Sequence, residues 1–422
     1  MPKKNLLPIL LTAMTLGTTW AIRGQFGHEQ GAAWAGAIAC LMLVMVAKRS
    51  EWAESGLKAS FFGAVGWGLG GMMSYGVLVG YGKSPDFLNA SYGLLSLLVV
   101  GGLYGFLGGG LFGLGLTDSK ERKVPWHQVT VELTVGGLIF YYFIIEQLGW
   151  LMTPPRSEAW GVCAGAALAL AYFLYRSGYR NALRVALFSG LGAGFGFGFG
   201  NFLQTMGQLS GLTFNFWNVM EYSLGFFGGI GMAYGALTSS WQPAKKAAEK
   251  SVWPIYGLAV LIPFFVWEQS FWEKEITPML EKVAPGQMEF WAKAIPALAF
   301  LIWLALLGLA WKKAKTLKND LAVSTVSVLQ SVCWSLFLAY LAYTFLITGS
   351  FMSGYRPEQF LYLVNFGLIW FLVPKSSAQF SGEGIQGAGI WKLFFLILGL
   401  LILLAAISSS LHEGLPGMQT RF

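Results

Sequence analysis

Apolar residues form long runs along the whole chain, and short polar stretches separate these runs. An α-helix needs roughly 20 apolar residues to cross the hydrocarbon core of a bilayer. The pattern therefore predicts an all-α polytopic membrane protein with about 13 transmembrane helices in a single integral membrane domain covering residues 1–422. The runs lie near residues 5–28, 31–47, 58–82, 90–117, 127–152, 158–176, 182–206, 214–240, 252–272, 289–311, 321–348, 359–374 and 390–410.

Basic residues are concentrated in alternate connections between these runs. Lys- and Arg-rich short loops usually face the cytoplasm, so the pattern predicts a cytoplasmic N-terminus. An odd number of spans then places the tail 408–422 outside, and we expect the protein in a bacterial inner (plasma) membrane. The basic connections contain Lys48 and Arg49; Lys120, Arg122 and Lys123; Arg176, Arg180 and Arg184; Lys245, Lys246 and Lys250; and Lys312, Lys313, Lys315 and Lys318.

Composition agrees with a membrane protein and argues against several other classes. Charged residues make up 11% of the chain, against about 25% in soluble domains. The 55 glycines are typical of closely packed transmembrane helices. The net charge of +8 comes from short connections and does not indicate a nucleic-acid partner. Three His and three Cys lack the spacing of a metal site, so we predict neither a metal nor a cofactor.

A glutamate followed by a glutamine occurs three times at the outer end of a predicted helix, as Glu29-Gln30, Glu146-Gln147 and Glu268-Gln269. The pairs recur roughly every 120 residues and fall on the first, fifth and ninth helices. This spacing predicts parallel four-helix repeats. Their bounds are about 5–117, 127–240 and 252–374, and an extra C-terminal helix follows at about 390–410.

Glycine-rich phrases support the first two copies of the repeat. The segment 105–117 (GFLGGGLFGLGLT) resembles 225–238 (GFFGGIGMAYGALT), and 63–71 resembles 190–200. The third copy lacks these glycine runs and would be a decayed repeat. Three copies would form a pseudo-symmetric ring of twelve helices with the glutamates facing one axis. Chance similarity between glycine-rich segments is the alternative.

Charged side chains inside membrane-length runs are costly and usually serve a function. Counting residues from the helix ends places Arg23, His28, Glu29, Glu146, Asn201, Gln204, Glu221 and Glu268 in one outer layer. We predict a substrate-binding set of Arg23, His28, Glu29, Gln147, Asn201, Gln204, Glu221, Tyr222, Trp267 and Gln269. In the alternative interpretation, the pairs at 146 and 268 face lipid headgroups or water, and the aromatic residues form an interfacial belt.

These residues favour a secondary transporter of a small polar solute, sugar-like or cationic, coupled to protons or a cation through the outer glutamates. The alternative is a membrane-embedded glycan-active enzyme, a hydrolase or transferase whose catalytic pair would be Glu146 and Glu268. A carboxylate separation of about 5 Å would then indicate retention, and roughly 6.5–9.5 Å inversion. A scaffold protein with structural glutamates is a third hypothesis. The expected partners are the lipid bilayer and the solute or glycan, and the oligomeric state stays open.

Overall fold

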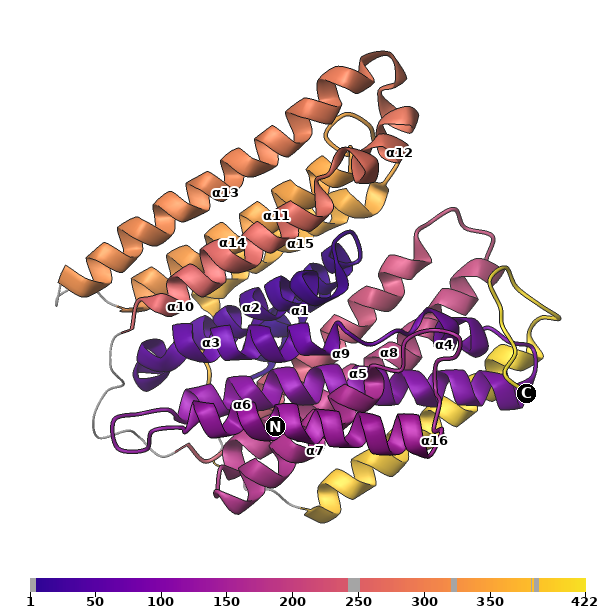
Figure 1. Cartoon of the computed structure of the whole chain (residues 1–422), viewed down its shortest axis with the longest axis horizontal. Coiled ribbons are helices and arrows are strands. Elements are labelled where there is room, and N and C mark those ends of the chain that lie inside the picture. The colour runs from indigo at the N-terminus through magenta and orange to yellow at the C-terminus, as the bar shows by residue number, and fades with distance from the viewer. Residues whose placement is uncertain (1–4, 242–250, 320–324, 381, 383–386) are drawn as a thin grey trace.

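The described residues of the computed structural model are 5–241, 251–319, 325–380, 382 and 387–422, and they form helices without strands (Figure 1). The basic connection predicted at Lys245, Lys246 and Lys250 lies outside the described residues, as does the start of the predicted run 321–348. The helices are α1 (Leu6–Arg23), α2 (His28–Ala47), α3 (Ser50–Gly70), α4 (Gly76–Gly82), α5 (Phe87–Thr117), α6 (Trp126–Phe140), α7 (Trp160–Arg176), α8 (Arg180–Leu209), α9 (Phe216–Leu237), α10 (Trp253–Tyr256), α11 (Ile262–Ser270), α12 (Glu273–Val283), α13 (Met288–Asn319), α14 (Thr325–Thr348), α15 (Pro357–Leu372) and α16 (Gly387–Ser410).

Every predicted apolar run contains a helix of the structure, which confirms the helical, membrane-type architecture. Among the described residues, eight helices are long and apolar enough to cross a membrane. The count rises to nine if α10–α11 and α12, bent by 65°, are taken as one broken span. The total of 13 spans and the internal repeats stay predictions.

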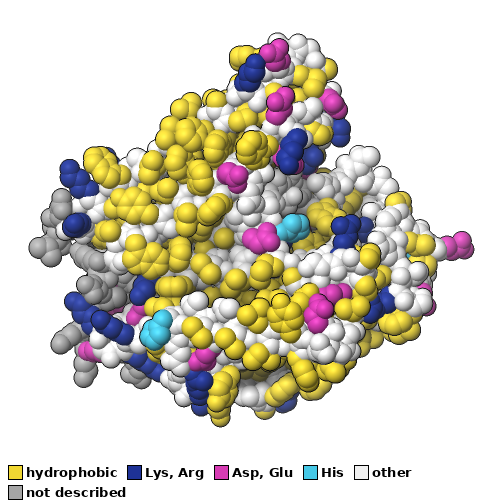
Figure 2. Space-filling view, viewed as in Figure 1, with side chains coloured by type: hydrophobic (Ala, Val, Ile, Leu, Met, Phe, Trp, Pro, Cys, Tyr) yellow, Lys and Arg dark blue, Asp and Glu magenta, His cyan; other side chains and the backbone are white. Residues whose placement is uncertain are grey.

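Consecutive helices run back and forth between two ends of the bundle (Figure 1). The connections after α2, α5 and α7 and the C-terminal end of α13 lie toward the left in Figure 1, and Lys and Arg side chains gather toward the left of the same view in Figure 2. We call this the basic end, represented by Lys48, Lys120, Arg176 and Lys312. The expectation that the basic end faces the cytoplasm stays a prediction.

Six helices form a closed circuit at the centre of the bundle: α1 packs on α2, α2 on α3, α3 on α5, α5 on α8, α8 on α9, and α9 on α1. The remaining helices flank this circuit. Helices α10–α15 form a layer on one side, the α6–α7 hairpin packs mainly on α5, and α16 lies against α5 and α8 (Figure 1). This arrangement differs from the predicted ring of twelve, because α6, α7 and α10–α15 lie outside the circuit.

Alternating glycines let α8 pack closely against two neighbours at once. A Cβ on Gly194 would lie 2.5 Å from the carbonyl oxygen of Leu98 in α5, and one on Gly196 would lie 2.5 Å from that of Ser223 in α9. Residues two apart on an α-helix point to nearly opposite faces, so alternate glycines clear both faces of α8. The helix continues without a break through this stretch, so the glycines serve packing rather than unwinding.

Glycines also surround Trp67 at the centre of the circuit. Ideal Cβ atoms on Gly36 of α2 and Gly108 of α5 would each lie 2.5 Å from the Trp67 ring, and one on Gly228 of α9 would lie 3.2 Å from it. Trp67 is fully buried and contacts Trp20 edge-on, with ring centroids 5.1 Å apart. Large aromatic rings therefore fill the space that the glycines leave, and they close the middle of the circuit.

The run predicted as one helix near 58–82 is broken in the structure. Helix α3 ends at Gly70, a non-helical segment follows at 71–75, and the short helix α4 begins at Gly76. Close packing explains part of this path, because a Cβ on Gly71 would lie 2.5 Å from the carbonyl oxygen of His28. Irregular backbone at membrane depth is tolerated where it is buried in protein or lines a cavity.

Two neighbouring glycines in α5 test the packing of the circuit. A Cβ on Gly101 would lie 2.5 Å from the backbone oxygen of Ala193, whereas one on Gly102 would have its nearest neighbour at 3.7 Å. We expect Gly101→Ala to destabilise the protein by about 1–3 kcal/mol through overpacking. Gly102→Ala should be neutral or stabilising by up to about 1 kcal/mol, because alanine is the better helix former. Unfolding in detergent would measure both, and equal effects would contradict the proposed close contact of α5 with α8.

Candidate functional site

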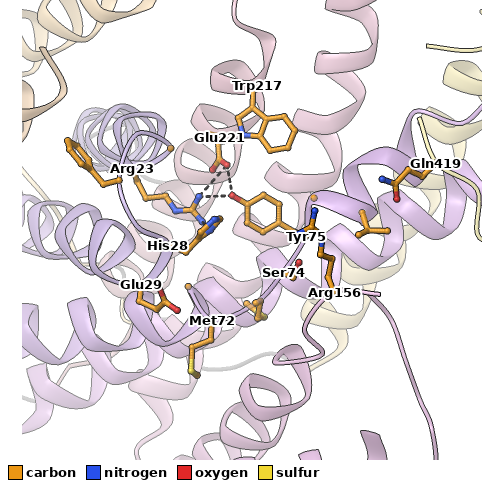
Figure 3. Close-up of a pocket in the computed structure, with 16 residues that line it drawn as sticks. Arg23, His28, Glu29, Met72, Ser74, Tyr75, Arg156, Trp217, Glu221 and Gln419 are labelled. Atoms are coloured by element: carbon orange, nitrogen blue, oxygen red, sulfur yellow. Dashed lines mark hydrogen bonds and ion pairs between the residues drawn. The ribbon is translucent and has the colours of Figure 1, made fainter. Parts of the chain in front are cut away.

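The candidate site is a pocket of about 600 Å³ at the His28 end of α2, opposite the Lys48 end, and Figure 3 shows it close up. Three parts of the central circuit form it: the turn between α1 and α2, the non-helical segment between α3 and α4, and the first turns of α9. Its lining includes Arg23, Phe26, His28, Glu29, Met72, Ser74, Tyr75, Arg156, Trp217, Glu221 and Gln419. Charged and polar side chains thus converge from segments far apart in sequence.

Arg23 lies at the base of this pocket and is 2% exposed. It is the last residue of α1, and its guanidinium donates to Tyr75 Oη at 2.7 Å, to Glu221 Oε1 at 3.3 Å and to Tyr104 Oη at 3.0 Å. His28 Nδ1 lies 3.5 Å from its second terminal nitrogen. Arg23 therefore connects four other segments of the central circuit.

Glu221 comes from the second turn of α9 and is fully buried. Its Oε1 accepts a hydrogen bond from Tyr75 Oη at 2.8 Å as well as the contact from Arg23. Tyr75 thus bridges the ion pair, and it can do so because the break between α3 and α4 places it at the end of the non-helical segment (Figure 3). We call Arg23, Tyr75, Tyr104 and Glu221 the buried polar cluster.

Aromatic rings surround the guanidinium of Arg23. The ring centroids of Trp20, Tyr75 and Tyr104 lie 5.2, 5.5 and 5.8 Å from its central carbon. Cation–π attraction is strongest where water is excluded, as it is here. Trp20 also contacts Tyr104 edge-on at 5.0 Å and Trp67 at 5.1 Å, so an aromatic layer lies directly beneath the charge.

Two buried atoms of the cluster have no hydrogen-bond partner among the described residues: Nε of Arg23 and Oε2 of Glu221. Burying an ion pair costs several kcal/mol per ion unless good geometry and further hydrogen bonds compensate. An unsatisfied buried polar atom adds a further cost of about 1–3 kcal/mol. The cluster therefore retains one acceptor and one donor that are buried and unpartnered, and a proton on Glu221 or a movement that opens the cluster to a polar ligand could satisfy them.

The depth of the cluster differs from the sequence-based estimate. Tyr104 lies near the middle of α5, which has 31 residues and a length of roughly 46 Å. Arg23, in contrast, ends α1, so α5 extends well beyond the Arg23 end of α1. The predicted outer layer assumed that all helices begin at one level. The structure instead places Arg23 and Glu221 beside the middle of the longest helix in the circuit.

The mouth of the pocket carries exposed polar and charged groups. His28 and Glu29 begin α2 and are exposed, and Arg156 enters from the connection between α6 and α7. Trp217 at the start of α9 is 37% exposed and presents part of its ring surface there. Figure 2 shows this face as hollowed, with histidine, acidic and basic side chains around the hollow.

The structure brings together four of the predicted site residues, Arg23, His28, Glu29 and Glu221, in this one pocket. Gln269 is exposed and accepts a hydrogen bond from the side chain of Gln30, one residue beyond Glu29. Tyr222 points away from the pocket lining, since it packs on Gly17 of α1 and stacks on Phe226. Trp267 donates to the carbonyl oxygen of Pro296 and belongs to the flanking layer.

Asn201 and Gln204 form a separate buried polar contact in α8. The amide of Asn201 donates to Gln204 Oε1 and to the carbonyl oxygen of Val79, each at 3.3 Å. Val79 belongs to α4, so this contact fixes the short helix that follows the break. These two residues support the segment that carries Tyr75 rather than line the pocket themselves.

Glu146, Gln147 and Glu268 do not line the pocket. Glu146 and Gln147 end a π-helical stretch, Tyr141–Gln147, and both are exposed. Glu268 is half-buried in α11, within the flanking layer. The glutamates of the predicted outer layer therefore do not line one cavity: Glu146 and Glu268 lie apart from Glu29 and Glu221, because α6 and α11 lie outside the central circuit.

Sequence reasoning missed Tyr75, Tyr104, Arg156 and Trp217 as site residues. A tyrosine among glycines and aliphatic residues is usually a packing residue or part of an interfacial aromatic belt. Nothing in the sequence around Tyr104 therefore indicated a site residue. The segment 70–75, GGMMSY, did carry one, because two glycines followed by serine interrupt an apolar run. Among the described residues no three His, Cys, Asp or Glu side chains converge on a metal-sized site.

Removing one partner of the buried polar cluster should be costly. We expect Glu221→Gln to destabilise the protein by about 3–5 kcal/mol, because the charge of Arg23 would stay buried without a counter-ion. The double variant Arg23→Met/Glu221→Gln should lose less than the sum of the single changes, with a coupling of at least about 1 kcal/mol. Glu29→Gln, at the exposed mouth, is the control and should stay within about 0.5 kcal/mol of wild type. Strictly additive effects would contradict the ion pair.

Comparisons with known proteins do not assign this chain to a family. No family model, no curated protein and no solved structure matches the chain. The buried polar cluster and the pocket above it are therefore the features of the molecule that bear on its function.

Proposed function

We propose that this protein is a secondary transporter of a small polar solute, coupled to protons or to a cation through Glu221. One observation carries the proposal: the broken helix α3–α4 supplies Tyr75 to a buried Arg23–Glu221 pair beside the middle of α5. Discontinuous helices that meet charged side chains at mid-membrane depth are typical of transporter binding sites. A protein with buried glutamates of purely structural function would not need the adjoining pocket.

The ion pair offers a simple coupling mechanism. With Glu221 ionised, its Oε1 holds both Arg23 and Tyr75 against α9. Protonation of Glu221, or a cation at its free Oε2, would weaken the attraction for Arg23 and release the contact between α1 and α9. Tyr75 belongs to the irregular segment, so the same event would loosen the α3–α4 break. The aromatic layer of Trp20, Tyr104 and Trp67 beneath the pair would act as the inner gate.

The pocket suits a compact solute. Its volume of about 600 Å³ lies within the range of small-molecule sites, roughly 300–1,000 Å³. The charges of Arg23 and Glu221 balance each other, and the indole of Trp217 offers a flat apolar surface at the rim. Unpartnered donor and acceptor atoms below an aromatic surface favour a solute with hydroxyl groups, such as a sugar or polyol, or a small organic cation.

A glycan-active enzyme is the second candidate, and one observation favours it: Glu29 and Glu221 line the same pocket beside His28. The catalytic pair would then be Glu29 and Glu221 rather than Glu146 and Glu268. Glu221 is fully buried and ion-paired, which suits a positioning or coupling role better than nucleophilic attack. The transporter is therefore the better-supported proposal.

Uptake into proteoliposomes tests the proposal. Vesicles containing the purified protein and an internal pH dye would be given glucose, mannitol, glycine and choline in turn. We expect at least one of these solutes to drive both uptake and a change in internal pH. Glu221→Gln should abolish the pH change, because the carboxylate that carries the proton is lost. The matched control is Glu146→Gln, an exposed glutamate outside the pocket, which should behave as wild type.

Two results would contradict the proposal. The first is a pH change that persists unaltered in Glu221→Gln vesicles. The second is Glu221-dependent cleavage of an oligosaccharide by the detergent-solubilised protein with no uptake of any solute, which would establish the enzyme instead.

A further inference from the structure

A second cavity lies at the opposite end of the molecule, near the basic end. It is a groove of about 630 Å³ between the end of α2, the first half of α14 and the end of α15. Apart from Gln330, its walls are apolar or aromatic, and its two charged lining residues are both basic. The lining consists of Val44, Met45, Lys48, Arg49, Val326, Leu329, Gln330, Trp334, Trp370, Val373 and Pro374.

Lys48 at the mouth of this groove has an unusual backbone conformation. With φ of 50° and ψ of 33° it is left-handed, the one non-glycine residue with positive φ in the described part of the chain. Glycine is the common residue at this position after a helix, since it adopts the conformation without steric cost. A lysine held there is strained, and strained residues often mark functional sites. The αL turn directs the chain so that Lys48 stands beside α15, where its Nζ donates to the carbonyl oxygen of Pro374 at 3.3 Å.

Arg49, the second basic residue of the groove, binds other residues of the protein. Arg49 Nε pairs with Glu51 at 3.1 Å, its Nη2 donates to the carbonyl oxygen of Trp241, and its guanidinium stacks over Phe380 at 4.9 Å. Lys48, in contrast, makes one long hydrogen bond with three available protons and is exposed. Lys48 is therefore the group that can bind an anion.

The rest of the groove suits a hydrocarbon chain. Trp334 and Trp370 form a tilted pair with ring centroids 4.7 Å apart, and Trp370 remains 52% exposed. Leu329 and Val373 are buried behind them. The groove thus combines an apolar channel between helices with a cation at its end, which complements an acyl chain and an anionic headgroup.

We propose that this groove binds one anionic phospholipid, such as phosphatidylglycerol, with its phosphate on Lys48 and an acyl chain along Trp334 and Trp370. The position at the basic end agrees with this occupant, because basic pockets between helices on the cytoplasmic side attract anionic headgroups. The inference is independent of the solute pocket, which lies toward the other end of the bundle.

Native mass spectrometry of the purified protein tests the proposal with two lipids of equal acyl chains, phosphatidylglycerol and phosphatidylcholine. Wild type should retain one phosphatidylglycerol in preference to phosphatidylcholine. Lys48→Asn should lower that preference roughly fivefold, the effect of one cation near an anionic headgroup. Asparagine tolerates the left-handed conformation, so this variant should fold as wild type does. Lys48→Arg keeps the charge and should keep the preference.

Lys312→Gln is the matched control, because Lys312 is exposed on α13 at the same end but outside the groove. It should retain phosphatidylglycerol as wild type does. Equal retention of the two lipids by wild type would overturn the proposal. An unchanged preference in Lys48→Asn would also overturn it, because the phosphate would then not depend on Lys48. An equal loss in Lys312→Gln would do the same, because lipid binding would then depend only on overall surface charge.

Discussion

The burial of one positive charge constrains the centre of this protein. Arg23 is 2% exposed. The free-energy cost of removing a guanidinium from water is compensated only where a counter-ion and hydrogen bonds replace the lost hydration. Glu221, Tyr75 and Tyr104 provide these contacts from α9, from the break after α3 and from the middle of α5. The positions of three segments thus depend on a single side chain at the end of α1.

Close helix packing makes this convergence possible. Glycines on both faces of α8 allow α5 and α9 to approach it at backbone contact, and glycines of α2, α5 and α9 make room for Trp67. Aromatic rings thus fill the centre of the circuit below the cluster, and beside the cluster the backbone is irregular, because α3 ends and residues 71–75 follow. The transport mechanism proposed above would use this interrupted helix to convert a change of charge at the ion pair into movement.

Much of the fold could be predicted from the sequence, because apolar runs of membrane length have few alternatives to helices. The cost of charge in such runs likewise singled out Arg23, His28, Glu29 and Glu221, which the structure brings into one pocket. The same cost of charge also singled out Glu146 and Glu268, which do not line the pocket. Hydropathy does not show which face of a helix packs on the central circuit and which faces away from it.

The tyrosines of the site could not be predicted for a different reason. Tyr75 reaches Glu221 because the chain leaves the helical path after Gly70, and Tyr104 reaches Arg23 because α5 continues beyond the end of α1. Both contacts depend on where a helix ends relative to its neighbours in the bundle, and the hydropathy pattern does not give this information. The sequence therefore predicted four of the titratable residues that line the pocket but not the neutral partners that hold Arg23 and Glu221.

Access to the pocket from the two faces of the membrane tests the central claim most directly. A single cysteine at Ser74, in the non-helical segment, would be treated with a membrane-impermeant maleimide in right-side-out and inside-out vesicles, with wild type as the control because Cys40, Cys163 and Cys333 are all buried. A transporter that exposes this site alternately to both sides predicts labelling in both preparations, faster in right-side-out vesicles. Labelling confined to one face would contradict alternating access at the Arg23–Glu221 site.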